Sequence, residues 1–248
     1  MTNQDELEDS LDRLQTDWTD VWNKVWATFE PKKSWLTDLD KRDRIKEKLS
    51  HFNPSHSKEP KHIDKVIKAL TRGNGLVDAA VGWKNPAINK PKARANLEKI
   101  RGIQWRLVIL YSGFEIMAKA LSNEFERNIS HNMYDDFIGK CFLSDYQPIA
   151  PLTNNPELKK WLDKEDEALM EFLGITGGDR RILNSWLVNS QAIYSWEDSF
   201  KLAKALRNAS AHGFLSPTKI DELKIKDSFR RLTLDLGTIL VAALSKIV

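Results

Sequence analysis

Three polar residues near the end of one predicted helix could act together on a phosphate ester. Arg207, Asn208 and His212 close the segment 196–212. An arginine stays charged and can hold two phosphate oxygens at once. A histidine, with an ordinary pKa of about 6.5, can exchange a proton at neutral pH. With RNA as the substrate, the ribose 2′-hydroxyl can be the nucleophile, so this chemistry requires no metal ion.

The spacing of these residues constrains how such a site could be built. Arg207 and His212 are five positions apart, and at about 100° per residue they would not share a face of an unbroken helix. Asn208 and His212, four positions apart, would share one. Arg207 and His212 can converge only if the helix ends near His212 or if a second copy of the chain supplies the partner. Gly213 fits the position after a helix C-terminus, and Pro217 fits the first turn of the next helix.

The same residues also have a purely structural interpretation. Arginine and histidine are favoured in the last turn of a helix because their positive charge interacts with the helix dipole. By spacing alone, a helix cap is the commoner explanation of such a pair. Both interpretations therefore stay open at this point.

Other candidate chemistries find less support. His51, His56 and His62 lie in or beside a polar loop, but their spacing matches no standard zinc pattern, so we interpret them as loop histidines. Cys141 has no histidine near it in sequence and is interpreted as a small buried apolar residue. The segment 72–75 (RGNG) is not followed by the sequence of a phosphate-binding loop and is predicted to be a turn.

The apolar periodicity predicts an all-α protein of long amphipathic helices. Apolar residues recur every three or four positions, and neither a hairpin signal nor an internal repeat is found. Gly113 should let another helix approach closely, and Ser195 is expected to cap the helix that carries the arginine–histidine pair. The predicted helices are 5–30, 34–50, 61–71, 93–128, 132–143, 156–173, 180–189, 196–212 and 217–246, and residues 76–92 are predicted to be irregular.

Two features of these helices have both a structural and a functional interpretation. Trp18, Trp22 and Trp26 form a stripe that could stack nucleic-acid bases, although we favour burial against a neighbouring helix. Glu115 lies among apolar residues of a helix expected to be largely buried, where a carboxylate usually needs a partner. We favour a salt bridge at the edge of the core, and the alternative is a supporting residue that orients the catalytic groups.

The composition is that of an ordinary soluble globular protein, with 41% hydrophobic and 29% charged residues among 248. A single cysteine excludes a disulfide framework within the monomer, and the acidic first residues do not resemble a signal peptide. The apolar run 232–244 is too short to span a bilayer. These features predict a cytoplasmic protein without a membrane association.

Charge is distributed unevenly along the chain. Residues 1–30 carry a balance of −6, residues 31–106 a balance of +11, and the remainder −2. The basic middle could attract a polyanion. Alternatively, the acidic first helix packs on the basic middle and the two charges cancel.

The segment Leu206–Gly213 (LRNASAHG) closely resembles the signature of the HEPN superfamily, which has an arginine, a polar residue, three variable residues and a histidine. The segment Gly113–Leu121 (GFEIMAKAL) looks like the first long core helix of that family. The resemblance covers residues 93–248 and implies a HEPN-like helical bundle. Residues 1–92 would then be an N-terminal helical extension of unknown role.

This resemblance implies a metal-independent endoribonuclease that needs no cofactor and acts as a homodimer with two motifs face to face. Arg207 would bind the scissile phosphate, His212 would be the general base or acid, and Asn208 would orient the site. The expected product has a 2′,3′-cyclic phosphate end. Such proteins are frequently toxins, anti-phage defence effectors or RNA-processing factors, and a regulatory protein partner would fit these roles.

One residue departs from a subset of this family. Members paired with small nucleotidyltransferase antitoxins carry a tyrosine two residues after the histidine, where the nucleotide modification occurs. Phe214 stands at that position here and has no hydroxyl group. An alternative to catalysis is a non-catalytic HEPN module that binds RNA, a nucleotide or a protein partner.

Overall fold

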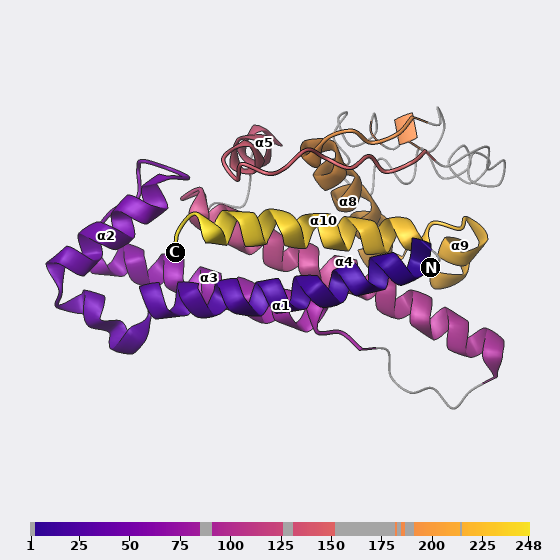
Figure 1. Ribbon diagram of the computed structural model, residues 1–248, viewed down its shortest axis with the longest axis horizontal. Coiled ribbons are helices and arrows are strands. Elements are labelled where there is room, and N and C mark those ends of the chain that lie inside the picture. The colour runs from indigo at the N-terminus through magenta and orange to yellow at the C-terminus, as the bar shows by residue number, and fades with distance from the viewer. Residues whose placement is uncertain are drawn as a thin grey trace.

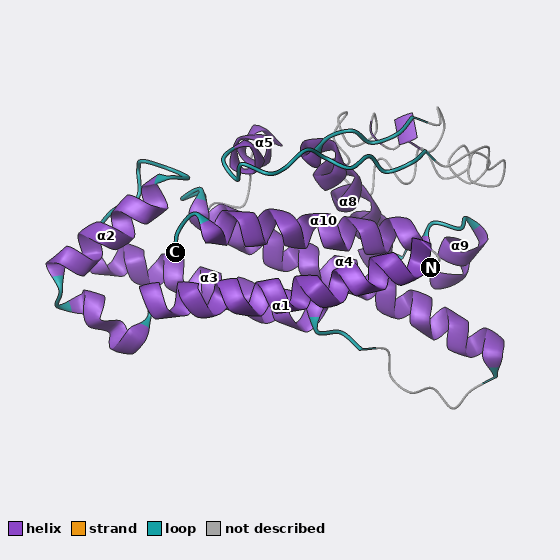
Figure 2. Cartoon of the chain, viewed as in Figure 1, coloured by secondary structure: helices purple, strands orange, loops and turns teal. Residues whose placement is uncertain are grey.

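The computed structural model describes residues 3–84, 91–125, 131–151, 182, 185–186, 191–213 and 215–248. Within these ranges the secondary structure is helical apart from one antiparallel bridge between Ile149 and Ile193 (Figure 2). The predicted all-α fold is therefore confirmed. Of the helices in these ranges, none is long and apolar enough to cross a membrane.

The described helices begin and end close to the predicted bounds in most cases. Those predicted at 156–173 and 180–189 lie almost entirely outside the described residues. The described elements are α1 (Asn3–Phe29), the 3-10 helix η1 (Pro31–Leu36), α2 (Leu39–Ser50), α3 (Pro60–Val81), α4 (Lys92–Leu121), α5 (His131–Gly139), α8 (Trp196–Ala211), α9 (Pro217–Glu222) and α10 (Lys226–Ser245).

The long helices α1, α3, α4 and α10 form the body of the molecule (Figure 1). α3 packs along α4, α1 packs along α10, and α10 also contacts α4. α8 packs against both α4 and α10, so the segment with Arg207 and His212 is held by the central helices. α2 and η1 lie at one end of the bundle, and α9 lies at the other.

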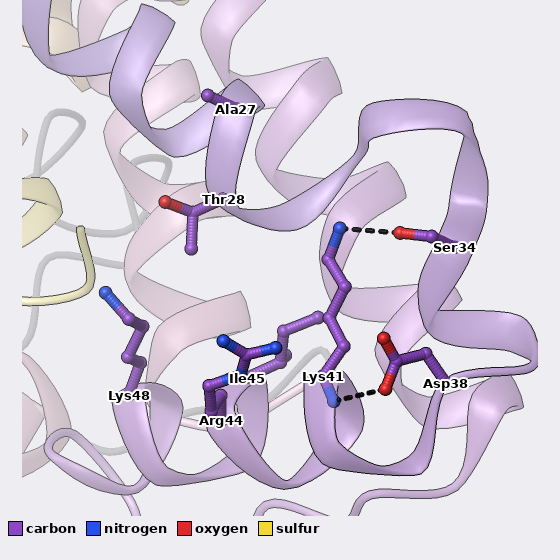
Figure 3. Close-up of a pocket in the computed structure, with 8 residues that line it drawn as sticks. All are labelled: Ala27, Thr28, Ser34, Asp38, Lys41, Arg44, Ile45 and Lys48. Carbon is purple, nitrogen blue, oxygen red and sulfur yellow. Dashed lines mark hydrogen bonds between the residues drawn. The ribbon is translucent and has the colours of Figure 1, made fainter.

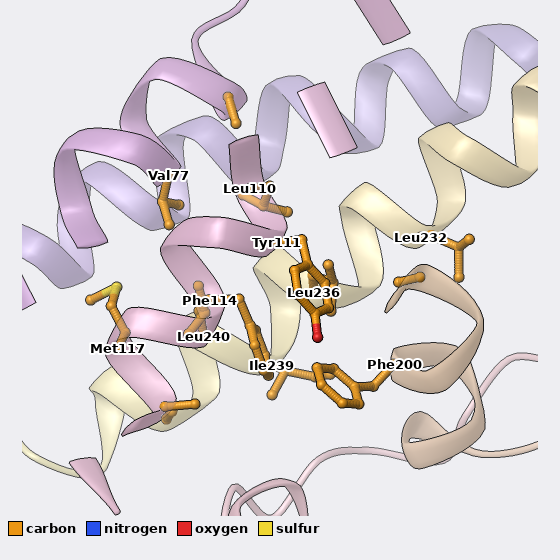
Figure 4. Close-up of a cluster of buried hydrophobic side chains, with 14 of the residues drawn as sticks. Val77, Leu110, Tyr111, Phe114, Met117, Phe200, Leu232, Leu236, Ile239 and Leu240 are labelled. Carbon is orange, nitrogen blue, oxygen red and sulfur yellow. The ribbon is translucent and has the colours of Figure 1, made fainter. Parts of the chain in front are cut away.

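One hydrophobic core runs through the bundle (Figure 4). Phe114 of α4 lies near its centre, with its ring centroid 5.2 Å from that of Phe200 of α8. Leu14 of α1 and Val77 of α3 belong to the same core as Leu236 of α10. Side chains from both sides of residue 92 are therefore buried together.

Two glycines allow the close approach of α3 and α4. A Cβ at Gly113 would lie 2.7 Å from Val77 Cγ2 and 2.9 Å from the carbonyl oxygen of Gly73. A Cβ at Gly73 would collide with Met117 and lie 3.2 Å from the carbonyl oxygen of Gly113. The two backbones thus meet where neither helix has a side chain, which confirms the expectation for Gly113.

The predicted turn at 72–75 is wrong, and so is the irregular structure predicted for the residues that follow it up to Val81. α3 continues through both segments. Glycine lowers helix propensity by about 1 kcal/mol, and this local signal suggested a turn. The contact of Gly73 with α4 outweighs that cost, because only glycine permits this packing distance.

Several other helix boundaries differ from the prediction. The helix predicted at 93–128 ends at Leu121, and the one predicted at 132–143 ends at Gly139. The helix predicted at 34–50 begins only at Leu39, and the chain before it contains Lys32 and Lys33 with positive φ angles of 56° and 51°. The helix predicted at 217–246 is divided between α9 and α10, because Lys224 adopts a φ of 55°. Left-handed backbone at a non-glycine residue gives no clear sequence signal.

The tryptophan stripe on α1 changes from buried to exposed along the helix. Trp18 is 1% exposed, and its Nε1 donates a hydrogen bond to Asn74 Oδ1 at 3.0 Å. Trp22 packs partly buried against the core, whereas Trp26 is 45% exposed. The predicted burial is confirmed for Trp18 and wrong for Trp26.

Candidate active site

Both ends of α8 are fixed by local interactions. Ser195 Oγ accepts a hydrogen bond from the Asp198 backbone N–H at 3.1 Å, which confirms the predicted cap. The helix ends at Ala211, and the His212 N–H still donates to the Asn208 carbonyl at 3.1 Å. Gly213 has a φ of +81°, a conformation that favours glycine. The helix therefore ends immediately before His212, as one of the two predicted arrangements requires.

Arg207 lies partly buried between α8 and α4. Its Nη1 donates a hydrogen bond to Asn208 Oδ1 at 2.8 Å, and its guanidinium carbon lies 5.2 Å from the centroid of the Tyr111 ring. Its Nε is buried without a hydrogen-bond partner in the described residues. No carboxylate of the described chain forms an ion pair with Arg207, so its charge is not neutralised by a direct partner there.

A second unsatisfied polar atom lies close to Arg207 on the same helix. Ser210 Oγ is buried and finds no partner within the described ranges. Residues 207 and 210 are three positions apart and lie on neighbouring parts of one helix face. Most buried polar atoms in proteins are hydrogen-bonded, and exceptions often mark a functional site.

Glu115 approaches this region through Tyr134 of α5. Burial is the main cause that raises the pKa of Tyr134, and the charge and hydrogen bond of Glu115 raise it further, whereas the charge of Arg207 acts in the opposite direction. Tyr134 is therefore influenced by Glu115 and Arg207 together. Glu115 Oε1 also pairs with Lys119 Nζ at 2.8 Å, which confirms the predicted salt bridge. A supporting role of Glu115 in catalysis stays a prediction.

His212 lies at the surface, together with Ala211 and Gly213. The hydrogen bond from the His212 N–H to the Asn208 carbonyl oxygen keeps these two residues one helical turn apart. The structure thus joins Arg207 directly to Asn208, and it presents His212 at the exposed helix end.

Two aromatic residues next to Arg207 were not identified as site residues from the sequence. Tyr111 was seen only as part of the apolar periodicity of α4, and Tyr134 lies on a different helix. Their rings contact Phe200 of α8, with centroid distances of 5.6 and 4.7 Å. A tyrosine at a predicted core position was the one available signal, because its hydroxyl group requires a partner when buried.

A buried carboxylate connects α8 to α10 on another side. Asp235 is 2% exposed and accepts hydrogen bonds from Tyr146 Oη at 2.8 Å, Ser199 Oγ at 2.6 Å and Arg231 Nε at 2.8 Å. Burial raises its pKa, although Arg231 and the hydrogen bonds oppose this shift. Because its oxygens are well satisfied, we interpret this network as structural.

The histidines and the cysteine have structural partners. His56 is 2% exposed, with Nδ1 2.9 Å from His62 Nε2 and Nε2 2.7 Å from the Leu121 carbonyl oxygen. His51 Nε2 lies 2.9 Å from the Lys140 carbonyl oxygen. Cys141 is buried as predicted, and burial raises its pKa to about 12. The described residues include no group of three or more histidine, cysteine or acidic side chains that could hold a metal ion.

Comparisons with protein-family models, with curated proteins and with solved structures found no match to this chain. The resemblance of residues 206–213 to the HEPN signature therefore stays a prediction. Phe214, at the position that departs from one subset of that family, lies outside the described residues.

Proposed function

We propose that this protein is a metal-independent endoribonuclease of the HEPN type. The observation that carries this proposal is the state of Arg207, whose Nε is buried without a partner and whose charge has no paired carboxylate in the described chain. A buried N–H group without an acceptor is costly, and a substrate phosphate would supply both a counter-charge for the partly buried guanidinium and a further acceptor. If Arg207 served only to stabilise the helix end, a buried Nε without a partner would bring no benefit.

In the proposed reaction, the 2′-hydroxyl of the RNA attacks the adjacent phosphorus atom. Arg207 binds the non-bridging oxygens and stabilises the charge that develops on them. The 2′-hydroxyl loses a proton and the departing 5′-oxygen gains one; His212 carries out one of these two transfers, and water carries out the other. The bond from phosphorus to the 5′-oxygen breaks, which leaves a 2′,3′-cyclic phosphate and a 5′-hydroxyl. Asn208 holds the guanidinium through its 2.8 Å hydrogen bond.

The proposed active form is a homodimer. Arg207 lies partly buried beside α4, whereas His212 is exposed one turn further along. A second copy placed across the exposed helix end would bring another arginine–histidine pair to the same phosphate. A cytoplasmic toxin, an anti-phage effector or an RNA-processing factor, silenced by a regulatory partner, would use such an assembly.

The proposal is tested by incubating labelled total RNA with the wild-type protein and with the Arg207→Ala and His212→Ala variants, with and without EDTA. We expect cleavage by the wild type in both conditions, and loss of at least about 10²-fold in each variant. Full cleavage by either variant would contradict the proposal. RNA binding by the wild type without cleavage would instead favour a non-catalytic binding module.

Ser216→Ala provides a matched structural control near the same helix end. Ser216 Oγ caps α9 by accepting a hydrogen bond from the Lys219 N–H at 3.2 Å. Its removal should cost about 1 kcal/mol of stability without removing a proposed catalytic group. This variant should therefore cleave RNA at the wild-type rate, whereas His212→Ala should not.

A further inference from the structure

A basic pocket lies between the end of α1, η1 and α2, away from Arg207 and His212. Its volume is about 480 Å³, within the range of about 300–1,000 Å³ that is common for small-molecule sites. Lys41, Arg44 and Lys48 extend into it from one face of α2 (Figure 3). Three cations thus converge on one concave surface.

The surrounding protein does not neutralise these cations. The side chains of Arg44 and Lys48 make neither an ion pair nor a hydrogen bond with the described residues. Lys41 Nζ donates to the neutral hydroxyl of Ser34 at 2.7 Å. Asp38, the one acidic residue among the described pocket residues, accepts a hydrogen bond from the Lys41 backbone N–H at 3.0 Å and thereby caps α2.

The acidic residues in the first half of α1 do not neutralise Lys41, Arg44 and Lys48 either. Glu8 Oε1 pairs with Arg230 Nε of α10 at 2.6 Å. Burial lowers the pKa of Arg106 of α4, and the charges of Glu8 and Asp12 act against this shift. These carboxylates belong to the first half of α1. The pocket instead contains Ala27 and Thr28 from the opposite end of that helix. Of these two arginines, Arg106 alone belongs to the basic segment 31–106, and the acidic half of α1 forms no ion pair with the basic face of α2 among the described residues.

The arrangement of the cations favours a chain of phosphates over a single one. Residues 41, 44 and 48 follow a spacing of three and four, and they extend over about 10 Å of the helix axis. The Thr28 and Ser34 hydroxyls lie beside them as further polar groups, and the side of Ile45 offers a small apolar surface. A pocket of this limited size suits a compact ligand better than a continuous RNA strand, which needs an extended basic groove.

We propose that this pocket binds a small organic polyphosphate, such as a nucleoside di- or triphosphate, through Lys41, Arg44 and Lys48. The proposal does not depend on ribonuclease activity, because α2 and η1 lie at the opposite end of the bundle from α9, which follows the Arg207–His212 segment (Figure 1). A bound polyphosphate would supply the acceptor oxygens that Arg44 and Lys48 lack.

The test is isothermal titration of the full chain with ATP, tripolyphosphate and adenosine. We expect ATP and tripolyphosphate to bind with an affinity that falls as salt is added, and adenosine not to bind. The double variant Arg44→Gln/Lys48→Gln should lose at least about tenfold in affinity for both phosphate ligands. Because Arg44 is exposed and Lys48 only partly buried, thermal unfolding of this variant should match that of the wild type.

The double variant Lys46→Gln/Lys61→Gln is the charge-matched control. It removes the same number of positive charges from α2 and α3 without touching a pocket residue, so its affinity should stay within about twofold of the wild type. Equal losses in the two double variants would show non-specific attraction and overturn the proposal. The absence of ATP and tripolyphosphate binding would also overturn it, as would a pocket-dependent affinity seen only with a single-stranded RNA oligonucleotide.

Discussion

Replacing Arg207 by methionine separates a catalytic arginine from a structural one. Methionine keeps an unbranched apolar side chain that can still cover the Tyr111 ring, but the substitution removes the positive charge and every side-chain N–H group. We expect Arg207→Met to leave the free energy of unfolding within about 1 kcal/mol of the wild type. RNA cleavage should nevertheless fall by at least about 10²-fold, because the phosphate loses its cationic partner.

The expected change in stability follows from the contacts of Arg207. The variant loses the 2.8 Å hydrogen bond to Asn208, worth about 0.5–1.5 kcal/mol, and the cation–π contact with Tyr111, worth about 0.5–1 kcal/mol. It also removes a buried Nε without a partner, a group that costs about 1–3 kcal/mol. Gain and loss are of the same size, so they should nearly cancel.

Arg106→Met is the matched comparison, because Arg106 is a buried arginine with its partners in place. It is 8% exposed, and its Nε and Nη2 donate to the Ala80 and Val81 carbonyls at 2.7 and 2.8 Å. These carbonyls belong to the last turn of α3, where few backbone N–H groups remain, although the Ala80 carbonyl also accepts a long bond of 3.4 Å from the Trp83 N–H. Without the arginine N–H donors to these two carbonyls, the free energy of unfolding should fall by about 2–4 kcal/mol.

Urea unfolding followed by circular dichroism, together with cleavage of labelled RNA, tests both variants. Arg207→Met should be inactive but stable, and Arg106→Met should be active when folded but less stable. The reasoning is refuted if Arg207→Met costs more than about 2 kcal/mol and its lost activity merely follows the unfolded fraction. Wild-type cleavage by a stable Arg207→Met protein would refute the catalytic role itself.

Three further predictions concern the helices and the site. Gly113→Ala should lower the unfolding free energy by about 1–3 kcal/mol because its Cβ meets α3, whereas Gly75→Ala, with nothing within 4 Å, should raise it by up to about 1 kcal/mol; urea titrations compare them. Glu115→Gln should reduce cleavage by about tenfold with KM little changed, and an unchanged rate would leave Glu115 with its salt bridge alone. Burial lowers the pKa of His56 below the ordinary histidine value of 6.5, so the unfolded chain takes up a proton there before the folded one does. Stability should therefore decrease as the pH falls through about 6.5, and His56→Gln should flatten this dependence in unfolding curves measured between about pH 7.5 and 5.5.

The sequence was most informative about α8. Its cap at Ser195, its apolar face and the glycine after His212 are local features, and each acts within a few residues of the helix that it defines. The position of the helix end could therefore be predicted without knowing the fold. The same holds for Gly113, since a small residue in an apolar helix points to a close helix contact.

The surroundings of Arg207 could not be predicted in this way. Tyr111 and Tyr134 come from α4 and α5, and only the packing of these helices on α8 brings their rings to the arginine. The extent of α3 was missed for a related reason. Gly73 lowers the local helix propensity, and the compensating contact comes from Met117 and Gly113, about 40 positions further along the chain.

The packing of α3 on α4 bears directly on the candidate site. Tyr111 and Glu115 are four positions apart and lie on one face of α4, whereas Gly113, two positions from each, lies on the opposite face. That opposite face is the one that meets Gly73 and Val77 of α3. The helix that lies beneath Arg207 is therefore held from behind by a helix of the first 92 residues. Because the close contact at Gly113 fixes how far α4 can move toward α3, we expect Gly113→Ala to displace the Tyr111 face and to reduce RNA cleavage as well as stability, whereas Gly75→Ala should leave cleavage unchanged.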